Sequence, residues 1–285
     1  MRVLADWPDA EPLDDLAAVV ETAGDTRTRA IAARGLNRMA PQAPARAARA
    51  AEALAGALAT TTDATERKNL LAALIGIPSL PSLQAVHAQL KQPELASAAA
   101  AGLLGISEVI YPWHLAEVKT ALSDLRRSGS LSPEMTKRAD ALTARLGQPA
   151  NFALGGLASS PDGIEKDGDA HGDQAAIDGN PDTYWDEVDN QQLYRLRVQL
   201  RERSTIGWLR ILGFNHQNYA PKDFEIRCDD RVVKTVTDAA YTNNRLTVAF
   251  PPVTCSVVEL VITGAHGPSP AVRELEFYAE PPPKP

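Results

Sequence analysis

The sequence predicts a multidomain α plus β protein, in which an N-terminal α-solenoid precedes an antiparallel β-sandwich. The 285 residues exceed the roughly 100–200 residues of an ordinary domain, so two domains are expected. Residues 1–148 are rich in Ala and carry apolar side chains at helical spacing. Residues 149–280 instead alternate apolar and polar side chains in short runs, and residues 281–285 form a proline-rich tail.

Eight helices are expected in the first domain. Short segments rich in Gly, Pro and polar residues separate the periodic stretches, for instance AGDT, APQAP and SGSLSP. Pro12, Pro44 and Pro133 stand near three of the starts, where the first turn of a helix tolerates a proline. The expected ranges are 12–22, 26–40, 44–59, 63–76, 80–90, 94–105, 112–127 and 132–146.

Three similar segments recur among these helices. They are ARGLNRM (33–39), LAALIGI (71–77) and AAGLLGI (100–106), and each closes the second helix of a pair. Small Ala and Gly side chains let helices approach closely, and a single helical hairpin cannot bury such a face alone. The pattern resembles a degenerate array of HEAT-type repeats with about four helix pairs. A plain helical bundle is the alternative.

The second domain is predicted to consist of short strands. LYRLRVQL (193–200) alternates Leu196, Val198 and Leu200 with polar side chains. Further alternating runs follow after Gly, Pro, Asn or Asp, namely TIGWLRILGF, DFEIRC, RLTVAF, SVVELVIT and VRELEFY. Many short strands with regular turn signals favour an antiparallel β-sandwich.

Charge and motifs exclude several classes of function. Residues 1–150 hold 16 Lys/Arg and 16 Asp/Glu, so the net charge of -7 arises entirely in the second half. An acidic surface argues against nucleic acid and against anionic membranes as partners. No apolar run approaches the ~18 residues of a membrane span. The sequence has no P-loop, GxGxxG, HExxH or GxSxG motif, so we expect no catalytic residues and no enzyme activity.

The cysteines and the first residues bear on the compartment. Cys228 follows Phe224 and Ile226 at the spacing of a strand, so a buried free thiol is expected. A disulfide between Cys228 and Cys255 is the alternative and would indicate an oxidising compartment. The start of the chain has no apolar segment typical of a signal peptide. We therefore expect a cytosolic protein, or a periplasmic or cell-surface one if the chain is a fragment of a longer secreted protein.

The stretch AAIDGNPDTYWDE (175–187) crowds oxygen-bearing side chains beside a tryptophan. It has three interpretations. Calcium prefers six to eight oxygen ligands, and Gly179 would let the backbone turn so that they converge. Asp178 would alternatively accept backbone N–H groups in an ordinary Asx turn. A glycosidase pair chosen from Asp186, Glu187 and Asp189 would need carboxyl groups ~5–9.5 Å apart across a cleft, and a solvated acidic loop is the more ordinary explanation.

Several segments of the second domain together resemble the discoidin family, also called coagulation factor five/eight type C domains. They are NFALGGLASSP, AIDGNPDTYW, PKDFEI and AVRELEFY, which follow the family's order between residues 150 and 279. The segments are similar as well to related galactose-binding-like carbohydrate-binding modules. The resemblance implies an eight-stranded jelly roll that binds sugars, lipid head groups or proteins through loops at one end. Many such domains carry a structural Ca²⁺ ion.

The resemblance also implies which residues would bind calcium. Ala175 and Arg273 would contribute carbonyl oxygens, and Thr183 both its carbonyl and its hydroxyl oxygen. The implied ligands are Ala175, Asp178, Asn180, Thr183, Arg273 and Glu274. Glu276 lies on the same side of its strand as Glu274 and is the second choice for the carboxylate from the last strand.

Two tryptophans are expected in the core of the second domain. The family packs the tryptophan corresponding to Trp185 beneath the first loop, and Trp208 is in phase with Ile206 and Leu212. Asp186 and Glu187 are expected to face solvent at the rim of the ligand edge.

The ligand edge is expected in five loops, 161–173, 184–192, 215–222, 238–244 and 264–270. Aromatic rings suit the apolar face of a pyranose, while amides and imidazoles bind its hydroxyl groups. The candidate ligand-binding residues are His171, His216, Asn218, Tyr219, Tyr241, Asn243 and His266. Galactose-specific relatives commonly combine a His, an Arg and an Asn, but GFNHQNYAPKDF has no Arg at that place.

Three hypotheses about function follow. The leading one is a non-catalytic binding module, in which a HEAT-like scaffold carries a Ca²⁺-stabilised discoidin-like domain that binds a carbohydrate. The alternative is a structural or interaction module that binds another protein or another domain of a longer parent chain. The third is a glycan-acting enzyme that uses the acidic loop around Asp186. The combination of domains also looks like modules of large multidomain proteins from environmental bacteria.

Overall fold

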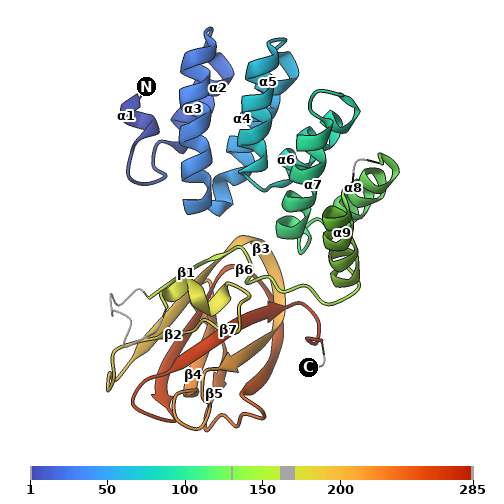
Figure 1. Ribbon diagram of the computed structural model, residues 1–285. Helices are drawn as coiled ribbons and strands as arrows, with labels where there is room; N and C mark the ends of the chain where they lie inside the picture. Colours follow the sequence, from blue (N-terminus) through green and yellow to red (C-terminus); the bar gives the residue numbers. More distant parts are fainter. Residues whose placement is uncertain (1, 130, 161–170, 284–285) are drawn as a thin grey trace. The chain divides into compact units, whose positions relative to one another are not determined.

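The computed structural model describes residues 2–129, 131–160 and 171–283. The chain divides into two compact units, Met1–Gly147 and Gln148–Pro285. The first unit is helical and the second is an antiparallel β-sandwich, which confirms the predicted α plus β multidomain fold class (Figure 1). Among the helices that the structure describes, none is long and apolar enough to cross a lipid bilayer.

Within the described residues, the first unit contains nine α-helices. Their bounds are α1 Arg2–Ala5, α2 Leu13–Thr22, α3 Thr26–Met39, α4 Ala47–Thr60, α5 Ala64–Ile75, α6 Leu80–Ala88, α7 Ala96–Ile110, α8 Leu115–Arg127 and α9 Pro133–Arg145. Apart from the end of α7, helices α2 to α9 match the eight expected ranges to within three residues. α7 continues to Ile110 because Ile106 and Ile110 prolong its buried stripe.

Side-chain caps determine where four of these helices begin. Asp25, Asp63, Ser79 and Ser132 precede α3, α5, α6 and α9, and each side chain accepts a hydrogen bond from the backbone N–H three residues later. Such a cap satisfies an N–H group that has no partner inside the helix and stabilises the helix by about 1 kcal/mol. The polar breaks in the sequence therefore contain the residues that start the next helix.

The helices stack as successive pairs. α2 packs on α3, α4 on α5 and α6 on α7. Each second helix also contacts the next one, since α3 touches α5, α5 touches α7 and α7 touches α9. Ala and Leu side chains such as Ala32, Leu36, Leu71 and Leu104 are buried in these contacts. Stacked pairs are the arrangement that a solenoid requires, and the assignment of the pairs to HEAT-type repeats stays a prediction.

The second unit contains seven strands among the described residues, and all of their pairings are antiparallel. Their bounds are β1 Leu157–Ser159, β2 Trp185–Asp186, β3 Tyr194–Gly213, β4 Pro221–Cys228, β5 Arg231–Val236, β6 Arg245–Ala265 and β7 Ala271–Tyr278. The strand order is β2-β7-β3-β6-β4-β5, with β1 beside β3. Side chains such as Leu196, Phe224 and Phe277 form the core, and Cys228 and Cys255 are buried in it as free thiols.

Two long strands take the place of four strands expected from the sequence. LYRLRVQL and TIGWLRILGF both belong to β3, and RLTVAF and SVVELVIT both belong to β6. The register between β3 and β6 shifts between Gln199 and Ser204, and again between Ile206 and Trp208. Bulges of this kind bend a strand and increase its twist, so a single strand can continue around the sandwich. The described residues therefore hold seven strands, rather than the eight that the resemblance implies.

The second register shift also changes the position of Trp208. Ile206, Leu209 and Ile211 are fully buried, whereas Trp208 and Leu212 are half-buried. A bulge moves the following side chains to the opposite face, because side chains along a strand alternate with a period of two. The expectation that Trp208 belongs to the core is therefore wrong, since it assumed an unbroken alternation from Ile206.

The two ends of the β-sandwich are joined by hydrogen bonds. The backbone N–H of Phe152 donates to the carbonyl of Phe277 at 2.8 Å. The buried side-chain oxygen of Asn151 accepts the N–H groups of Ala153 and Phe277, both at 3.0 Å. The segment that enters the sandwich therefore lies beside the end of its last strand.

Substitution of two glycines of α7 by alanine would test the contact between α5 and α7. A Cβ atom at Gly102 would lie 2.3 Å from Ile75 Cγ1, whereas nothing lies within 4 Å of a Cβ atom at Gly105. Both changes to Ala gain about 1 kcal/mol of helix propensity. Only Gly102→Ala forces Ile75 to move, at a typical cost of about 1–3 kcal/mol. We expect the Gly105→Ala variant to have a higher free energy of unfolding in urea than the Gly102→Ala variant, by about 1–3 kcal/mol. Equal values for the two variants would contradict the observed contact.

Candidate functional site

The loop of residues 175–183 folds around Asp178. One carboxylate oxygen of Asp178 accepts the N–H of Asn180 at 2.7 Å, and the other accepts the hydroxyl of Thr183 at 2.8 Å. Gly179 has a φ of 79°, a conformation that residues with a Cβ atom rarely adopt. The Asx-turn hydrogen bond and the convergence of oxygen atoms thus occur together in one loop.

Glu274 of β7 lies near Asp178 with its carboxyl group buried. The residue is 5% exposed, and neither carboxyl oxygen has a hydrogen-bond partner among the described residues. Burial, and then the nearby Asp178 carboxylate, raise the pKa of Glu274 to about 8. A buried carboxylate is costly unless it is paired or coordinates a metal. A proton on Glu274 or a cation between the two carboxyl groups would therefore lower the free-energy cost of burying this carboxyl group.

Two of the residues expected to supply carbonyl oxygens, Ala175 and Arg273, belong to the turn before this loop and to the strand that carries Glu274. Ala175 is buried in the short 3₁₀ turn Asp173–Ile177 that leads into the loop. Arg273 directly precedes Glu274 in β7, and its guanidinium donates to the carbonyl of Pro181. Strand β7 is thereby hydrogen-bonded to the loop next to Glu274.

Other candidate ligands are already engaged. The side-chain oxygen of Asn180 accepts the N–H of Asp182 at 3.1 Å, and Glu276 forms an ion pair with Arg210. In the part of the chain that the structure describes, no three His, Cys, Asp or Glu side chains converge as metal ligands do. The donors near Glu274 are instead two carboxyl groups with hydroxyl, amide and carbonyl oxygens, which suit a hard cation such as Ca²⁺ better than Zn²⁺.

Glu187 is buried, which corrects the expectation that it faces solvent. It is 2% exposed, and one carboxyl oxygen accepts the indole N–H of the buried Trp185 at 2.9 Å. The same oxygen contacts the hydroxyl of Ser160, whose oxygen also lies 2.8 Å from a carboxylate oxygen of Asp173. Burial raises the pKa of Glu187, while the hydrogen bonds from Ser160 and Trp185 oppose this shift. The carboxyl group is inside because the indole N–H of a core tryptophan needs an acceptor.

Asp186 is half-buried rather than fully exposed. Its carboxylate accepts the hydroxyl of Ser269 at 2.8 Å and the backbone N–H of Glu187 at 2.9 Å. Two of the three carboxyl groups that could form a glycosidase pair, those of Asp186 and Glu187, therefore serve as hydrogen-bond acceptors that hold the loop, and Asp189 is exposed.

Four rings form a continuous ring cluster from His171, Tyr184, Phe214 and Tyr219. The ring of Tyr184 stacks on that of Phe214 with centroids 4.2 Å apart, and His171 and Tyr219 make edge contacts at 5.6 and 6.0 Å. The guanidinium of Arg273 lies 5.0 Å from the Phe214 centroid. The cluster is thus connected through Arg273 to the strand that carries Glu274.

Tyr241 lies between two imidazoles in a second group, the His–Tyr–His cluster. Its ring centroid is 6.1 Å from that of His216 and 6.2 Å from that of His266. The Tyr241 hydroxyl donates to the carbonyl of Pro221 at 3.0 Å, and burial raises the pKa of Tyr241. The ring of Tyr241 therefore packs against both imidazoles and holds His216 and His266 in position.

Hydrogen bonds fix the tautomer of both histidines. His216 Nδ1 lies 2.5 Å from Asn244 Oδ1, an oxygen that also accepts the backbone N–H of His216 at 3.0 Å. His266 Nε2 lies 2.9 Å from the carbonyl oxygen of Ala239. Because both partner atoms are acceptors, His216 carries a proton on Nδ1 and His266 on Nε2. In the neutral rings, His216 Nε2 and His266 Nδ1 are left as acceptors.

The two candidate asparagines lie in different places. Asn218 is exposed in the turn 215–219, which is closed by the N–H groups of Asn218 and Tyr219 on the Asn215 carbonyl, both at 2.9 Å. Asn243 is exposed in a tight turn and lines a groove of about 530 Å³ together with Trp208. The structure thus unites His216, Tyr241 and His266, places His171 and Tyr219 in the ring cluster, and leaves Asn243 in a separate groove.

Sequence reasoning did not single out Tyr184 and Phe214, the two central rings of the ring cluster. Both stand at the edge of a predicted loop, Tyr184 at the start of 184–192 and Phe214 directly before 215–222. An aromatic residue at a strand end is equally compatible with the core. Only the stacking of the two rings across separate loops distinguishes them.

One family model matches part of the second unit. The model of the F5/8 type C domain matches residues 158–277. No curated protein matches the chain.

Three similar solved structures are carbohydrate-binding modules. A chitosan-binding module 1 derived from chitosanase/glucanase from Paenibacillus sp. IK-5 is 20% identical, with 45% of this chain and 98% of that chain covered and a TM-score of 0.39. The family 32 module of Clostridium perfringens NanJ in complex with galactose is 21% identical, with 46% and 98% covered and a TM-score of 0.38. CpGH89CBM32-5 of the same organism, in complex with GalNAc-β-1,3-galactose, is 19% identical, with 46% and 100% covered and a TM-score of 0.40.

The pH dependence of stability tests the burial of Glu187. Its pKa is raised in the folded protein, so the folded state holds this proton to a higher pH than the unfolded chain does. The resulting stability is present below the unfolded pKa and is lost as pH rises through the folded pKa. Glu187→Gln keeps an acceptor for Trp185 but does not titrate. We expect its free energy of unfolding in urea to fall less than that of the wild type from about pH 4 to about pH 8, and parallel curves would contradict the assignment.

Proposed function

We propose that the second unit is a non-catalytic carbohydrate-binding module whose ligand edge combines the His–Tyr–His cluster with the ring cluster. The F5/8 type C domain is a family of non-catalytic binding modules, and its match over residues 158–277 supports a binding role. The observation that carries the proposal is the pair of fixed imidazoles, since His216 and His266 each keep one acceptor nitrogen beside the same tyrosine.

The chemistry of the edge matches that of a sugar. A saccharide offers hydroxyl protons and an apolar C–H face. His216 Nε2 and His266 Nδ1 would accept hydroxyl protons, and the exposed amide of Asn218 can both donate and accept. The half-buried rings of Phe214 and Tyr219 would pack against the C–H face. Such contacts bind and orient a ligand without any proton transfer.

We also propose that Ca²⁺ binds between the loop around Asp178 and strand β7. The two buried carboxyl oxygens of Glu274, which have no hydrogen-bond partner among the described residues, support this proposal. Asp178 and Glu274 would supply the charged ligands, with oxygens from Ala175, Asn180, Thr183 and Arg273 completing the set. The ion would supply a positive charge that makes the burial of Glu274 favourable.

Arg273 would couple calcium to the ligand edge. It is the neighbour of Glu274 in β7, and its guanidinium both bonds to the loop at Pro181 and lies over the ring of Phe214. Fixing Glu274 would therefore also fix one wall of the ring cluster. Calcium in this position has a structural role and takes no part in contacts with the sugar.

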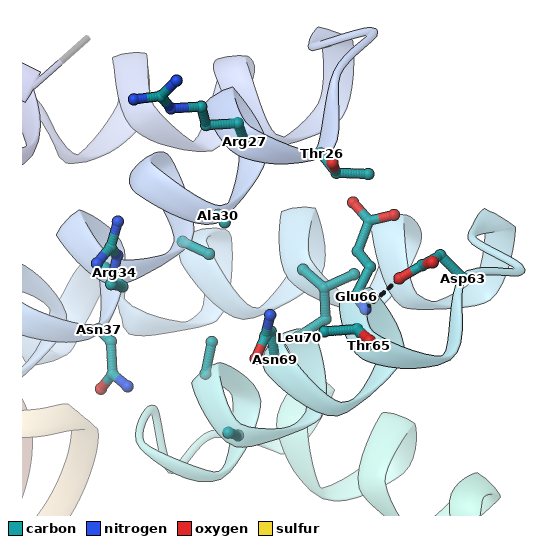
Figure 2. A pocket seen from close by; sticks show the side chains of 13 residues that line it. Thr26, Arg27, Ala30, Arg34, Asn37, Asp63, Thr65, Glu66, Asn69 and Leu70 are labelled. Carbon is teal, nitrogen blue, oxygen red and sulfur yellow. Dashed lines mark hydrogen bonds between the residues drawn. The ribbon is translucent and has the colours of Figure 1, made fainter.

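Protein binding by the helical unit is the second candidate function. It is favoured by a groove between α3 and α5 with an apolar floor and polar rims, whose chemistry differs from that of the sugar-binding edge (Figure 2).

A glycan array with variants of the full chain tests the sugar proposal. We expect His216→Ala and Tyr219→Ala each to weaken binding about tenfold, because each removes a hydrogen bond or a ring contact worth about 1–1.5 kcal/mol. Val232→Ala is the matched control, since it lies in β5 at the end of the β4–β5 hairpin remote from Pro221. The proposal fails if no glycan binds, or if both variants bind as the wild type does.

Thermal melting with calcium and with EDTA tests the metal proposal. We expect calcium to raise the melting temperature of the wild type and elemental analysis to find the bound metal. Glu274→Gln should lose both effects, because an amide needs no counter-charge, and should be at least as stable as the wild type in EDTA. Glu276→Gln is the control on the same strand and should keep both effects, since Glu276 pairs with Arg210. A metal-free wild type with unchanged melting in EDTA would overturn the proposal.

A further inference from the structure

A groove of about 520 Å³ lies in the helical unit between α3 and α5, the second helices of two successive pairs (Figure 2). Arg27, Arg34 and Asn37 of α3 form one wall, and Thr65 and Asn69 of α5 form the other. The carbohydrate proposal for the second unit makes no use of this groove.

Small side chains explain why the groove exists. Ala30 and Ala33 of α3 and Ala72 and Ala73 of α5 line it. An alanine reaches only to its Cβ atom, so the facing surfaces leave open space where longer apolar side chains would close the gap. The groove therefore has an apolar floor with polar side chains along both rims.

The groove has cationic side chains that are not neutralised. Arg27 and Arg34 are exposed, and neither guanidinium forms an ion pair with another described residue. The two acidic residues of the lining are already engaged. Asp63 caps α5 by accepting the N–H of Glu66 at 2.7 Å, and buried Glu66 pairs with Arg29 at 2.6 Å. Asp63 keeps its negative charge as a cap, so Arg27 and Arg34 outnumber the one carboxylate of the lining that has no ion pair. The unpaired charge of the lining is therefore net positive, although the chain as a whole carries -7.

The spacing of the two arginines fits an extended chain. Arg27 and Arg34 are seven residues apart on α3, which places them on one face at a separation of about 10 Å along the axis. A polyproline II chain presents residues i and i+3 on the same side, about 9 Å apart. Two acidic side chains three residues apart in such a chain would each meet one guanidinium.

The asparagines favour a peptide over a sugar in this groove. Asn37 and Asn69 line it, and a primary amide can donate to a peptide carbonyl and accept from a peptide N–H. The lining contains no aromatic ring, whereas sugar sites commonly place a ring against the C–H face. A bare polyanion would accept from the arginines and from the amide N–H groups, but it has no N–H group to donate to the amide oxygens.

We propose that this groove binds an extended acidic segment of a partner protein. Arg27 and Arg34 pair with two carboxylates of that segment at positions i and i+3, and Asn69 hydrogen-bonds its backbone.

Fluorescence anisotropy with the full chain tests this assignment. The probe is a fluorescein-labelled peptide of about four Glu-Pro-Ala repeats, which places an acidic residue at every third position of a polyproline II chain. Its counterpart with Gln in place of Glu is the charge control. We expect the Glu peptide to bind more tightly than the Gln peptide and to dissociate as ionic strength rises, because the charges are exposed to solvent.

Variants separate peptide recognition from general attraction of anions. The double variant Arg27→Gln/Arg34→Gln should bind the Glu peptide about five- to tenfold more weakly, as expected for two exposed charge pairs. Asn69→Ala should also weaken it. Lys119→Gln removes an exposed charge of α8 outside the groove and should have no effect. Arg27, Arg34 and Lys119 are exposed cations, and Asn69 is an amide. Thermal melting checks that each variant is folded.

Three outcomes would overturn the proposal. The first is no binding of the Glu peptide to the wild type, and the second is equal binding by the arginine double variant. The third is displacement by a heparin fragment that binds more tightly than the peptide, together with no effect of Asn69→Ala, which would identify an unspecific anion site.

Discussion

The second unit depends on how it accommodates the buried carboxyl group of Glu274. Glu274 is buried, and its backbone pairs with that of Leu212 in β3, so the carboxyl group is held inside the sandwich by the strand that carries it. Its partner in space, Asp178, belongs to a loop 96 residues earlier in the chain. Whatever neutralises this pair therefore also joins the first loop to the last strand. The ring cluster depends on that junction, because Arg273 contacts both the loop and Phe214.

Burying a carboxyl group costs free energy, and the second unit stabilises its two buried glutamates, Glu187 and Glu274, in different ways. Glu187 has neutral donors for one carboxyl oxygen, the indole of Trp185 and the hydroxyl of Ser160, while its other oxygen has no partner among the described residues. Glu274 has no such donor among the described residues. Hydrogen bonds from neutral groups oppose the rise in the pKa of Glu187, whereas a site with converging oxygens alone depends on a proton or a cation. The second unit would therefore respond to protons or cations at Glu274.

The sequence predicted local structure well and long-range pairing poorly. Helix positions followed from apolar periodicity and from short polar breaks such as SGSLSP, which are visible in a short window and which contain caps such as Ser132. The approach of Glu274 to Asp178 was accessible only through the family resemblance. Trp208 was misplaced because a bulge depends on the register between β3 and β6. Glu187 was misplaced because its contact with Ser160, 27 residues earlier in the chain, arises only when separate segments meet.

The hydrogen bonds that join Phe152 to Phe277, with Asn151 buried beside them, have a consequence for how the sandwich fits into longer proteins. Its entry and exit lie side by side, so a host chain could be interrupted at a surface loop and continue with little displacement. Domains with adjacent termini tolerate insertion and circular permutation for this reason. The closure at Asn151 therefore makes this sandwich a portable unit, which recombination could move between proteins without redesigning either partner.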